Sequence, residues 1–336
     1  MPNPTSNVQQ LKMLGLPVIQ TLDDFSFLTH ISKYTIFQLS KNSAKYYRTF
    51  GVLKKSGKTR IIAEPSRKLK GLQAWILVNI LNRLKVSDSC FGFEKGSSIV
   101  DNARMHVGAN IIINFDLNDF FPSVHVRRVY SIFRSIGYNT LISTILTNLT
   151  TFQSGLPQGA PTSPKLANLV LWKLDARIQG YVGKKGIVFT RYADDLTFSG
   201  IFPNRVCKII PTVKKIIEDE GFSLNDRKTR IAGTSKAKKV TGLIVNENSV
   251  GVGKKVYKLL RAKIHYLSKL ETEAGINSTD GKNLFLHIKG WLSYLNSVDP
   301  TRYRRTRIYI QKLLVKSEND FLQSLMVTTS HSVNEN

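Results

Sequence analysis

Two adjacent aspartates lie between two short apolar runs of this chain, in the tetrapeptide Tyr192-Ala193-Asp194-Asp195. The flanking residues 186–190 and 196–199 are rich in β-branched and aromatic types and are bounded by glycines, which predicts two strands joined by a tight turn. Carboxylates this close repel each other unless a cation neutralises them, and hard divalent ions such as Mg²⁺ prefer oxygen ligands. We therefore predict a hairpin whose tip binds metal; the alternative is a solvated acidic turn.

A third carboxylate, Asp116, follows the apolar run 111–115, which predicts a buried strand. Burying an unpaired charge is costly, so an acid at the end of such a strand is expected to have a partner. A helix N-cap at Asp116 is the alternative. We predict that Asp116, Asp194 and Asp195 together hold two Mg²⁺ ions, as in two-metal nucleotidyl transfer.

The charge balance points to a polyanionic partner. The chain has 49 basic and 23 acidic residues, a net charge of +26, and a sequence pI near 10.1. Residues 251–316 alone carry 14 basic and four acidic side chains. No basic amphipathic membrane segment or lipidation motif stands out, so nucleic acid is the favoured partner over a membrane surface.

The length of 336 residues and 42% hydrophobic content are typical of a globular enzyme with two or three subdomains. No apolar run approaches a membrane span and residues 1–6 do not resemble a signal peptide, so a cytoplasmic protein without a membrane partner is expected. The two cysteines, Cys90 and Cys207, form no metal-binding or disulfide pattern.

Helices and turns are predicted between these strands. Helical spacing of apolar residues runs from Leu69 to Leu84, and residues 124–150 and 164–178 are each expected to form one helix. Residues 52–62 are two apolar runs joined by a basic, glycine-containing turn, which predicts a further hairpin. A strand, helices and then an antiparallel hairpin predict a ferredoxin-like layer, and hence an α+β fold.

A loop punctuated by glycine and proline, residues 156–169, lies between the two acidic motifs and contains Gln158 and Gly159. The acidic strand, this loop and the Tyr-x-Asp-Asp turn occur in the order found in reverse transcriptases, and the chain resembles that family over residues 50–245. The resemblance implies a right-hand polymerase fold with fingers, a ferredoxin-like palm and a helical, basic thumb.

The resemblance also implies roles for individual residues around the acids. Lys58 and Arg60, in the basic hairpin, would bind the triphosphate, although an ordinary solvated turn is equally compatible with the pattern. Gln158 would lie beside the incoming nucleotide, and Phe121 would exclude ribonucleotides by its size. Lys228 matches a lysine that could protonate the departing pyrophosphate; the alternative is a surface lysine.

Further motifs narrow the resemblance to one branch, the retron enzymes of the group II intron-like superfamily. They include Asn102-Ala103-Arg104-Met105-His106, Val240-Thr241-Gly242 and Arg302-Tyr303-Arg304-Arg305. His106 is expected to be structural or to contact RNA. Residues 302–309 alternate arginines with aromatics, which suits phosphate pairing and base stacking, and Lys254, Lys258 and Arg261 line one face of a predicted basic helix. The resemblance adds Val240, Thr241 and Gly242 as a possible RNA-recognition element. The predicted RNA contacts are therefore Val240, Thr241, Gly242, Lys254, Lys258, Arg261, Arg302, Arg304, Arg305 and Arg307.

Five regions follow from this resemblance. They are an N-terminal helical extension (1–50), fingers (51–110, with part of 124–165), palm (111–250), thumb and RNA-binding region (251–326) and a flexible tail (327–336).

The implied function is RNA-directed synthesis of DNA from deoxynucleotides on a cognate retron non-coding RNA. The product would be multicopy single-stranded DNA in a branched RNA–DNA hybrid, primed from an RNA 2′-hydroxyl. Template removal would fall to a host ribonuclease H, and an effector protein would act with the enzyme in anti-phage defense. Two alternatives are an intron-encoded or diversity-generating reverse transcriptase, and a nucleic-acid-binding scaffold that restrains an effector.

Overall fold

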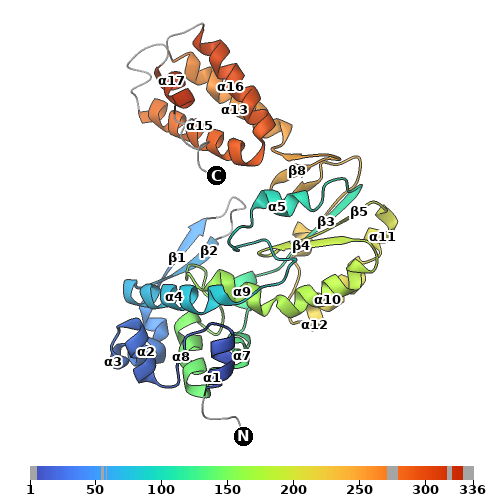
Figure 1. Cartoon of the computed structure of the whole chain (residues 1–336). Coiled ribbons are helices and arrows are strands. Elements are labelled where there is room, and N and C mark those ends of the chain that lie inside the picture. Colours follow the sequence, from blue (N-terminus) through green and yellow to red (C-terminus); the bar gives the residue numbers. More distant parts are fainter. Residues whose placement is uncertain (1–5, 54–56, 58, 271–278, 316–319, 328–336) are drawn as a thin grey trace. The chain divides into compact units, whose positions relative to one another are not determined.

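The chain divides into two units, of which unit 1 comprises residues 1–98 and 110–231 and unit 2 comprises residues 99–109 and 232–336. This computed structural model describes residues 6–53, 57, 59–270, 279–315 and 320–327 (Figure 1). Within the described residues, no helix is both long enough and apolar enough to cross a membrane.

Unit 1 contains a two-stranded hairpin, a four-stranded sheet and most of the helices. Its elements are α1 (Val8–Met13), α2 (Leu22–Thr29), α3 (Lys33–Lys41), η1 (Ser43–Tyr46), β1 (Tyr47–Leu53), β2 (Thr59–Pro65), α4 (Arg67–Asn79), η2 (Leu81–Arg83), β3 (Ile111–Asp116), α6 (Phe120–Ser123), α7 (Val126–Ser135), α8 (Thr140–Thr150), α9 (Ser163–Val170), α10 (Trp172–Gly183), β4 (Val188–Tyr192), β5 (Asp195–Gly200), α11 (Pro203–Cys207), α12 (Ile210–Asp219), η3 (Asp226–Lys228) and β6 (Arg230–Ala232), which ends at the boundary.

Unit 2 combines a small sheet with a group of helices. Its elements are α5 (Ile99–Arg104), β7 (Lys239–Val240), β8 (Leu243–Val245), β9 (Val250–Gly251), α13 (Lys254–Ser268), α15 (Thr279–Val298), α16 (Pro300–Leu314) and α17 (Asp320–Val327). The strands lie in the order β7-β8-β9, and α5 packs against all three. Helix α16 begins at Pro300, where the Asp299 side chain accepts a hydrogen bond from the Arg302 amide, a standard N-cap.

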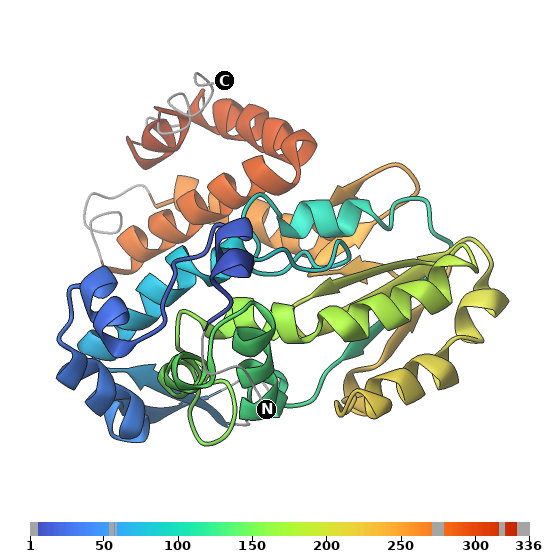
Figure 2. The same ribbon diagram turned by 60° about the horizontal axis from the view of Figure 1, so that its bottom comes forward.

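The four-stranded sheet confirms the predicted ferredoxin-like layer. Its strands lie in the order β4-β5-β3-β6. Strand β5 thus lies between β3 and β4, which follow each other in the chain, as in the split β-α-β arrangement. Both neighbours of β5 run antiparallel to it. Helix α10 packs against β4 and α12 packs against α10, which gives the sheet a helical layer on one face (Figure 1, Figure 2).

An aromatic cluster fixes the middle of this sheet. Phe198 of β5 stacks on Phe189 of β4 with ring centroids 5.0 Å apart and meets Phe115 of β3 edge to face at 5.7 Å. All three side chains are almost fully buried. They share one face of the sheet, because Phe189 is paired with Phe198 and Phe115 is paired with Leu196, two residues before Phe198. A one-residue slip of any strand would move its side chains to the opposite face and break this cluster.

The predicted helices exist, but they are shorter and more numerous than expected. Residues 124–150 form α7 and α8, separated at Gly137, which has a φ of 112°, and Asn139 caps α8. Residues 164–178 fall in α9 and α10, which meet at Leu171. Helix α4 ends at Asn79, before the predicted Leu84.

The five predicted regions remain a prediction, and their boundaries differ from those of the two units. Residues 99–109, assigned above to the fingers, belong to unit 2, and so do residues 232–250, assigned to the palm. The predicted tail, 327–336, lies outside the described residues except for Val327.

Candidate active site and nucleic-acid interface

The hairpin of β4 and β5 brings the three predicted acids to one end of the sheet. Tyr192 and Asp195 are paired, so Ala193 and Asp194 form a two-residue turn. Ala193 has a φ of 56°, a positive value of the kind that tight hairpin turns need at a central position. On its other side, Asp195 lies directly opposite Asp116 of β3.

Backbone hydrogen bonds hold these strand ends in place. The amide of Leu117 donates to the carbonyl of Asp194 at 2.9 Å, and the amide of Asn225 donates to the carbonyl of Asp116 at 2.8 Å. The turn and the end of β3 are thus tied together and to the segment before η3. These bonds fix the backbone positions from which the three carboxylates project.

The acids lie close enough together to raise the pKa values of two of them. Burial and repulsion from Asp116 raise the pKa of Asp194, an effect that Lys228 and Arg60 partly offset. Burial, together with repulsion from Asp194 and Asp116, raises the pKa of Asp195 to about 6. The carboxyl groups of Asp194 and Asp195 are therefore harder to ionise than an isolated aspartate, and a cation bound here would reverse that effect.

Lys228 already supplies one cation. Its Nζ donates to both carboxylate oxygens of Asp116 at 2.8 Å, and the Asp116 side chain is only 11% exposed. Among the described residues, no three His, Cys, Asp or Glu side chains are arranged to hold a metal ion as they stand. The all-oxygen donor set fits a hard divalent ion, provided that Asp116 exchanges the Lys228 ammonium for it.

The loop that contains Gln158 is held against β2 and α6 by close backbone contacts. The amide of Ala63, in β2, donates to the Gln158 carbonyl at 2.8 Å. At Gly159, with a φ of 135°, a Cβ would lie 2.7 Å from the Ala63 carbonyl oxygen, so only glycine allows this approach. The Leu156 amide donates to the Phe121 carbonyl at 3.2 Å, which links the loop to α6.

Of the other predicted nucleotide-binding residues, the structure describes Phe121 and Arg60. Phe121 is half-buried at the edge of the core. Arg60 is exposed on β2 and lies close enough to act on the charge of Asp194. Lys58, predicted to bind the triphosphate with Arg60, lies outside the described residues.

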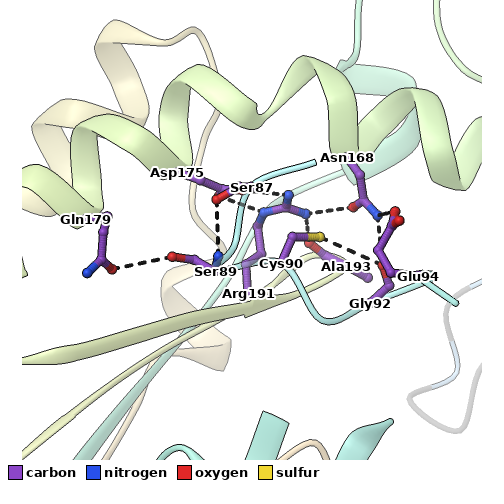
Figure 3. Close-up of polar contacts among 10 residues, drawn as sticks. All are labelled: Ser87, Ser89, Cys90, Gly92, Glu94, Asn168, Asp175, Gln179, Arg191 and Ala193. Atoms are coloured by element: carbon purple, nitrogen blue, oxygen red, sulfur yellow. Dashed lines mark hydrogen bonds and ion pairs between the residues drawn. The ribbon is translucent and has the colours of Figure 1, made fainter. Parts of the chain in front are cut away.

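A buried polar network behind the turn is not among the sequence predictions (Figure 3). Arg191 and Asp175 are both fully buried, and the guanidinium donates to both carboxylate oxygens at 2.8 Å. Arg191 also donates to Asn168 Oδ1 at 3.0 Å and to the carbonyl of Ala193, in the turn, at 3.2 Å. The sequence did offer a sign of this pair: Arg191 lies within an otherwise apolar strand, and Asp175 lies on the apolar face of a helix. Each would need a partner of opposite charge if buried.

In unit 2, two of the motifs quoted above lie side by side. Thr241 and Gly242 form the turn between β7 and β8, with φ values of 48° and 85°, and the Thr241 hydroxyl donates to the carbonyl of Ile99 at 3.1 Å. Val240 is fully buried, so its side chain cannot reach RNA and the predicted contact passes to Thr241 and Gly242. His106 is 1% exposed, and burial lowers its pKa to about 4, so it is neutral near pH 7.

The predicted basic contacts on the helices of unit 2 fall into two groups. Arg302 bonds to Asp299, Arg307 bonds to the Tyr303 hydroxyl, and Arg261 stacks on Tyr309 at 4.3 Å. These three cations make internal contacts that fix their positions. The remaining four are exposed: Lys254, Lys258, Arg304 and Arg305.

Comparison with known proteins relates this geometry to a family. A family model described as reverse transcriptase (RNA-dependent DNA polymerase) matches residues 52–246. The chain is 45% identical to the retron Ec86 reverse transcriptase of Escherichia coli over 314 residues, which cover 91% of this chain and 93% of that protein. It is 33% identical to the retron Mx65 reverse transcriptase of Myxococcus xanthus, covering 88% of this chain and 72% of that protein.

Among solved structures, the chain is similar to telomerase from Candida albicans, solved with a fragment of telomeric RNA. The TM-score is 0.45 at 11% identity, and the match covers 91% of this chain and 65% of that one. Apo telomerase from Candida tropicalis gives a TM-score of 0.46 at 11% identity, covering 84% of this chain and 61% of that one. The chain spans less than two thirds of the length of these telomerases.

Proposed function

Because the chain belongs to the bacterial retron reverse transcriptases, which are RNA-directed DNA polymerases with a right-hand fold, we propose that it copies a cognate retron non-coding RNA into multicopy single-stranded DNA. Synthesis starts from a 2′-hydroxyl of that RNA and leaves a branched RNA–DNA hybrid. The observation that carries the proposal is the cross-strand pair of Asp116 and Asp195, with Asp194 beside it at the hairpin tip.

In this proposal Asp116, Asp194 and Asp195 bind two Mg²⁺ ions. When bound, the pair would activate the primer hydroxyl and offset the charge that develops on the pyrophosphate. The carboxylates supply a rigid site, because their strands are hydrogen-bonded on both sides of β5. Lys228, once released from Asp116, would donate a proton to the departing pyrophosphate.

Deoxynucleotide binding falls to the residues around the Gln158 loop. Arg60, and in the same hairpin Lys58, would pair with the triphosphate, since guanidinium and ammonium groups bind phosphate strongly. Gln158 would lie beside the incoming nucleotide. Its position is supported by the backbone bond to β2 and by the close approach at Gly159.

Phe121 would discriminate against ribonucleotides by packing against C2′ of the sugar. Phe121→Val should therefore admit ribonucleotides, because the smaller side chain leaves room for a 2′-hydroxyl. The measurement is the ratio of deoxynucleotide to ribonucleotide incorporation by the purified variant. An unchanged ratio in a variant that still polymerises would remove Phe121 from this role.

Recognition of the cognate RNA is assigned to unit 2, whose exposed cations suit phosphate contacts. The hybrid product would be trimmed by a host ribonuclease H, and the protein with its hybrid would restrain an effector in anti-phage defense. This last part rests on the likeness to other retron enzymes. Deleting the effector's gene should then abolish protection from phage without changing the DNA product.

The decisive experiment compares the wild-type protein with an Asp194→Asn, Asp195→Asn variant, each purified from cells that carry the native locus. The bound nucleic acid is treated with ribonuclease and sequenced. The wild type should yield short DNA of one sequence joined to RNA, and the variant should yield RNA only. Both substitutions keep the size of the side chain, so the loss reports on charge.

A matched control is Asp23→Asn, which neutralises an exposed acid on α2 that pairs with Lys33. It should leave the DNA product unchanged. RNA without DNA in all three samples would contradict the proposed polymerase activity. It would favour the alternative, a nucleic-acid-binding protein that restrains an effector.

A further inference from the structure

Phe93 combines a strained backbone with a half-exposed ring. Its φ is 62° and its side chain is 49% exposed. Bulky L-residues rarely adopt this left-handed conformation, and such outliers persist only where the surrounding structure imposes them, often at functional sites. The question is what imposes this conformation and what the ring faces.

The segment before Phe93 is fixed against the catalytic hairpin. The Phe91 amide donates to the Arg191 carbonyl at 2.8 Å, and the Arg191 amide donates to the Ser89 carbonyl at 2.7 Å. At Gly92 a Cβ would lie 2.5 Å from the Ala193 nitrogen, so the loop touches the turn backbone to backbone. Any residue larger than glycine at position 92 would push one of them away.

The residues on either side of Phe93 are also held by side chains (Figure 3). Asn168 Nδ2 donates to the Gly92 carbonyl at 2.7 Å and to Glu94 Oε1 at 2.9 Å. Glu94 forms an ion pair with Lys165 at 2.6 Å, largely shielded from solvent. Asn168 is itself bonded to Arg191, so a single network sets the loop and the turn together.

The ring of Phe93 faces the residues of the proposed nucleotide site. Its centroid lies 6.3 Å from that of Phe121 and 6.5 Å from that of Tyr192. On the loop's other side is a pocket of about 380 Å³ that Phe93 also lines, with Pro161 and Pro164. The ring is therefore not enclosed by core packing, and its position is set by the backbone.

We propose that Phe93 is a specificity-determining residue of the polymerase. Its ring, with those of Phe121 and Tyr192, forms an aromatic surface against which the base pair being formed is packed, so that a mismatched pair of different shape loses contact. An aromatic face suits this role because it binds any base without reading its sequence. The inference rests on the proposed function, since it needs Phe121 beside the incoming nucleotide.

The test measures stability and selectivity in the same full-length variants. Phe93→Gly relieves the left-handed strain and removes the ring, so its melting temperature should be unchanged or higher. Its selectivity for a correct over a mismatched deoxynucleotide, on an RNA template annealed to a DNA primer, should fall roughly tenfold, the size expected for one lost base contact. Phe93→Tyr keeps the ring and should keep most of the selectivity.

Phe27→Ala, at an aromatic that is 77% exposed on α2, is the control and should match the wild type. A Phe93→Gly protein that melts at a lower temperature with unchanged selectivity would show that the ring only stabilises the fold. That result would overturn the inference. Unchanged values for both would overturn it as well. A wild-type protein that extends no primer would instead overturn the proposed function, and the inference with it.

Discussion

Unit 1 contains a fully buried ion pair, whereas the helices of unit 2 present exposed cations. Behind the catalytic turn, Arg191 and Asp175 are both fully buried and hydrogen-bonded, while on α16 Arg304 and Arg305 are exposed. A buried pair tolerates one geometry only, because each lost bond leaves a charge without solvent. Exposed cations can adapt to a flexible polyanion. Charge therefore fixes the position of atoms behind the turn of unit 1, and the exposed cations of unit 2 are the ones proposed to bind RNA.

The largest expected effect comes from breaking the buried pair. Arg191→Ala leaves Asp175 without a partner and should lower the free energy of unfolding by about 3–5 kcal/mol. Urea denaturation of the metal-free protein measures it. Arg177→Ala, which removes a guanidinium that is 38% exposed and pairs with Asp219 and Glu220, should cost much less, because solvent screens this pair. Equal losses would contradict the contrast between buried and exposed pairs.

Lys228 tests an intermediate case between buried and exposed charges, because it is a half-exposed cation next to a buried acid. Lys228→Ala should slow nucleotide addition by about 10²–10⁴-fold through loss of a proton donor. It should also tighten Mn²⁺ binding, measured calorimetrically without nucleotide, because it removes a cation that competes for Asp116. Lys214→Ala, which breaks the neighbouring pair with Asp226, should change neither value. Weaker Mn²⁺ binding in Lys228→Ala would refute the competition.

Exposed cations of unit 2 should affect binding without affecting stability. Arg304→Ala with Arg305→Ala should weaken binding of the cognate RNA and lower the slope of log affinity against log salt by about 1–2, as expected for two lost phosphate contacts. Filter binding over a range of salt concentrations measures both. Lys208→Ala with Lys215→Ala, at exposed lysines of unit 1, should leave the slope unchanged. Unchanged binding in the arginine variant would remove both residues from the interface.

The smallest effect concerns Asp195, whose pKa is raised to about 6 in the folded protein. A raised carboxyl pKa means that ionisation opposes folding, so this penalty is absent below about pH 4 and complete above about pH 6. Asp195→Asn should therefore stabilise the metal-free protein by about 1 kcal/mol at pH 8, a value reduced by solvent screening of the exposed side chain. Denaturation at pH 8 and pH 4 should show the gain only at pH 8.

The sequence predicted the parts of the site that depend on local patterns. Strand periodicity predicted the hairpin with the two aspartates at its tip; the turn is in fact Ala193-Asp194, and Asp195 is the first residue of β5. The apolar run before Asp116 placed that residue at the end of a buried strand. The ferredoxin-like order followed from the order of the elements. The breaks at Gly137 and Leu171 were missed because apolar periodicity continues across them.

Other features depend on contacts between distant segments and could not be read from one sequence. The pairing of Arg191 with Asp175 needs the packing of α10 on β4, and the strained φ of Phe93 depends on contacts with two other segments, β4 with its turn and α9. The grouping of residues 99–109 with residues 232–336 is likewise a tertiary contact. Local patterns therefore predicted where the acidic strand ends lie, and packing between distant segments determined how they are held.

The missing side chain at Gly92 has a consequence for engineering. Because the loop and the catalytic turn touch through their backbones at this point, neither can be replaced alone by the corresponding piece of another polymerase without a clash or a gap. Residues 87–94 and 188–195 must therefore be exchanged together. Recombined enzymes should stay active when both segments come from the same parent and fail when they come from different ones.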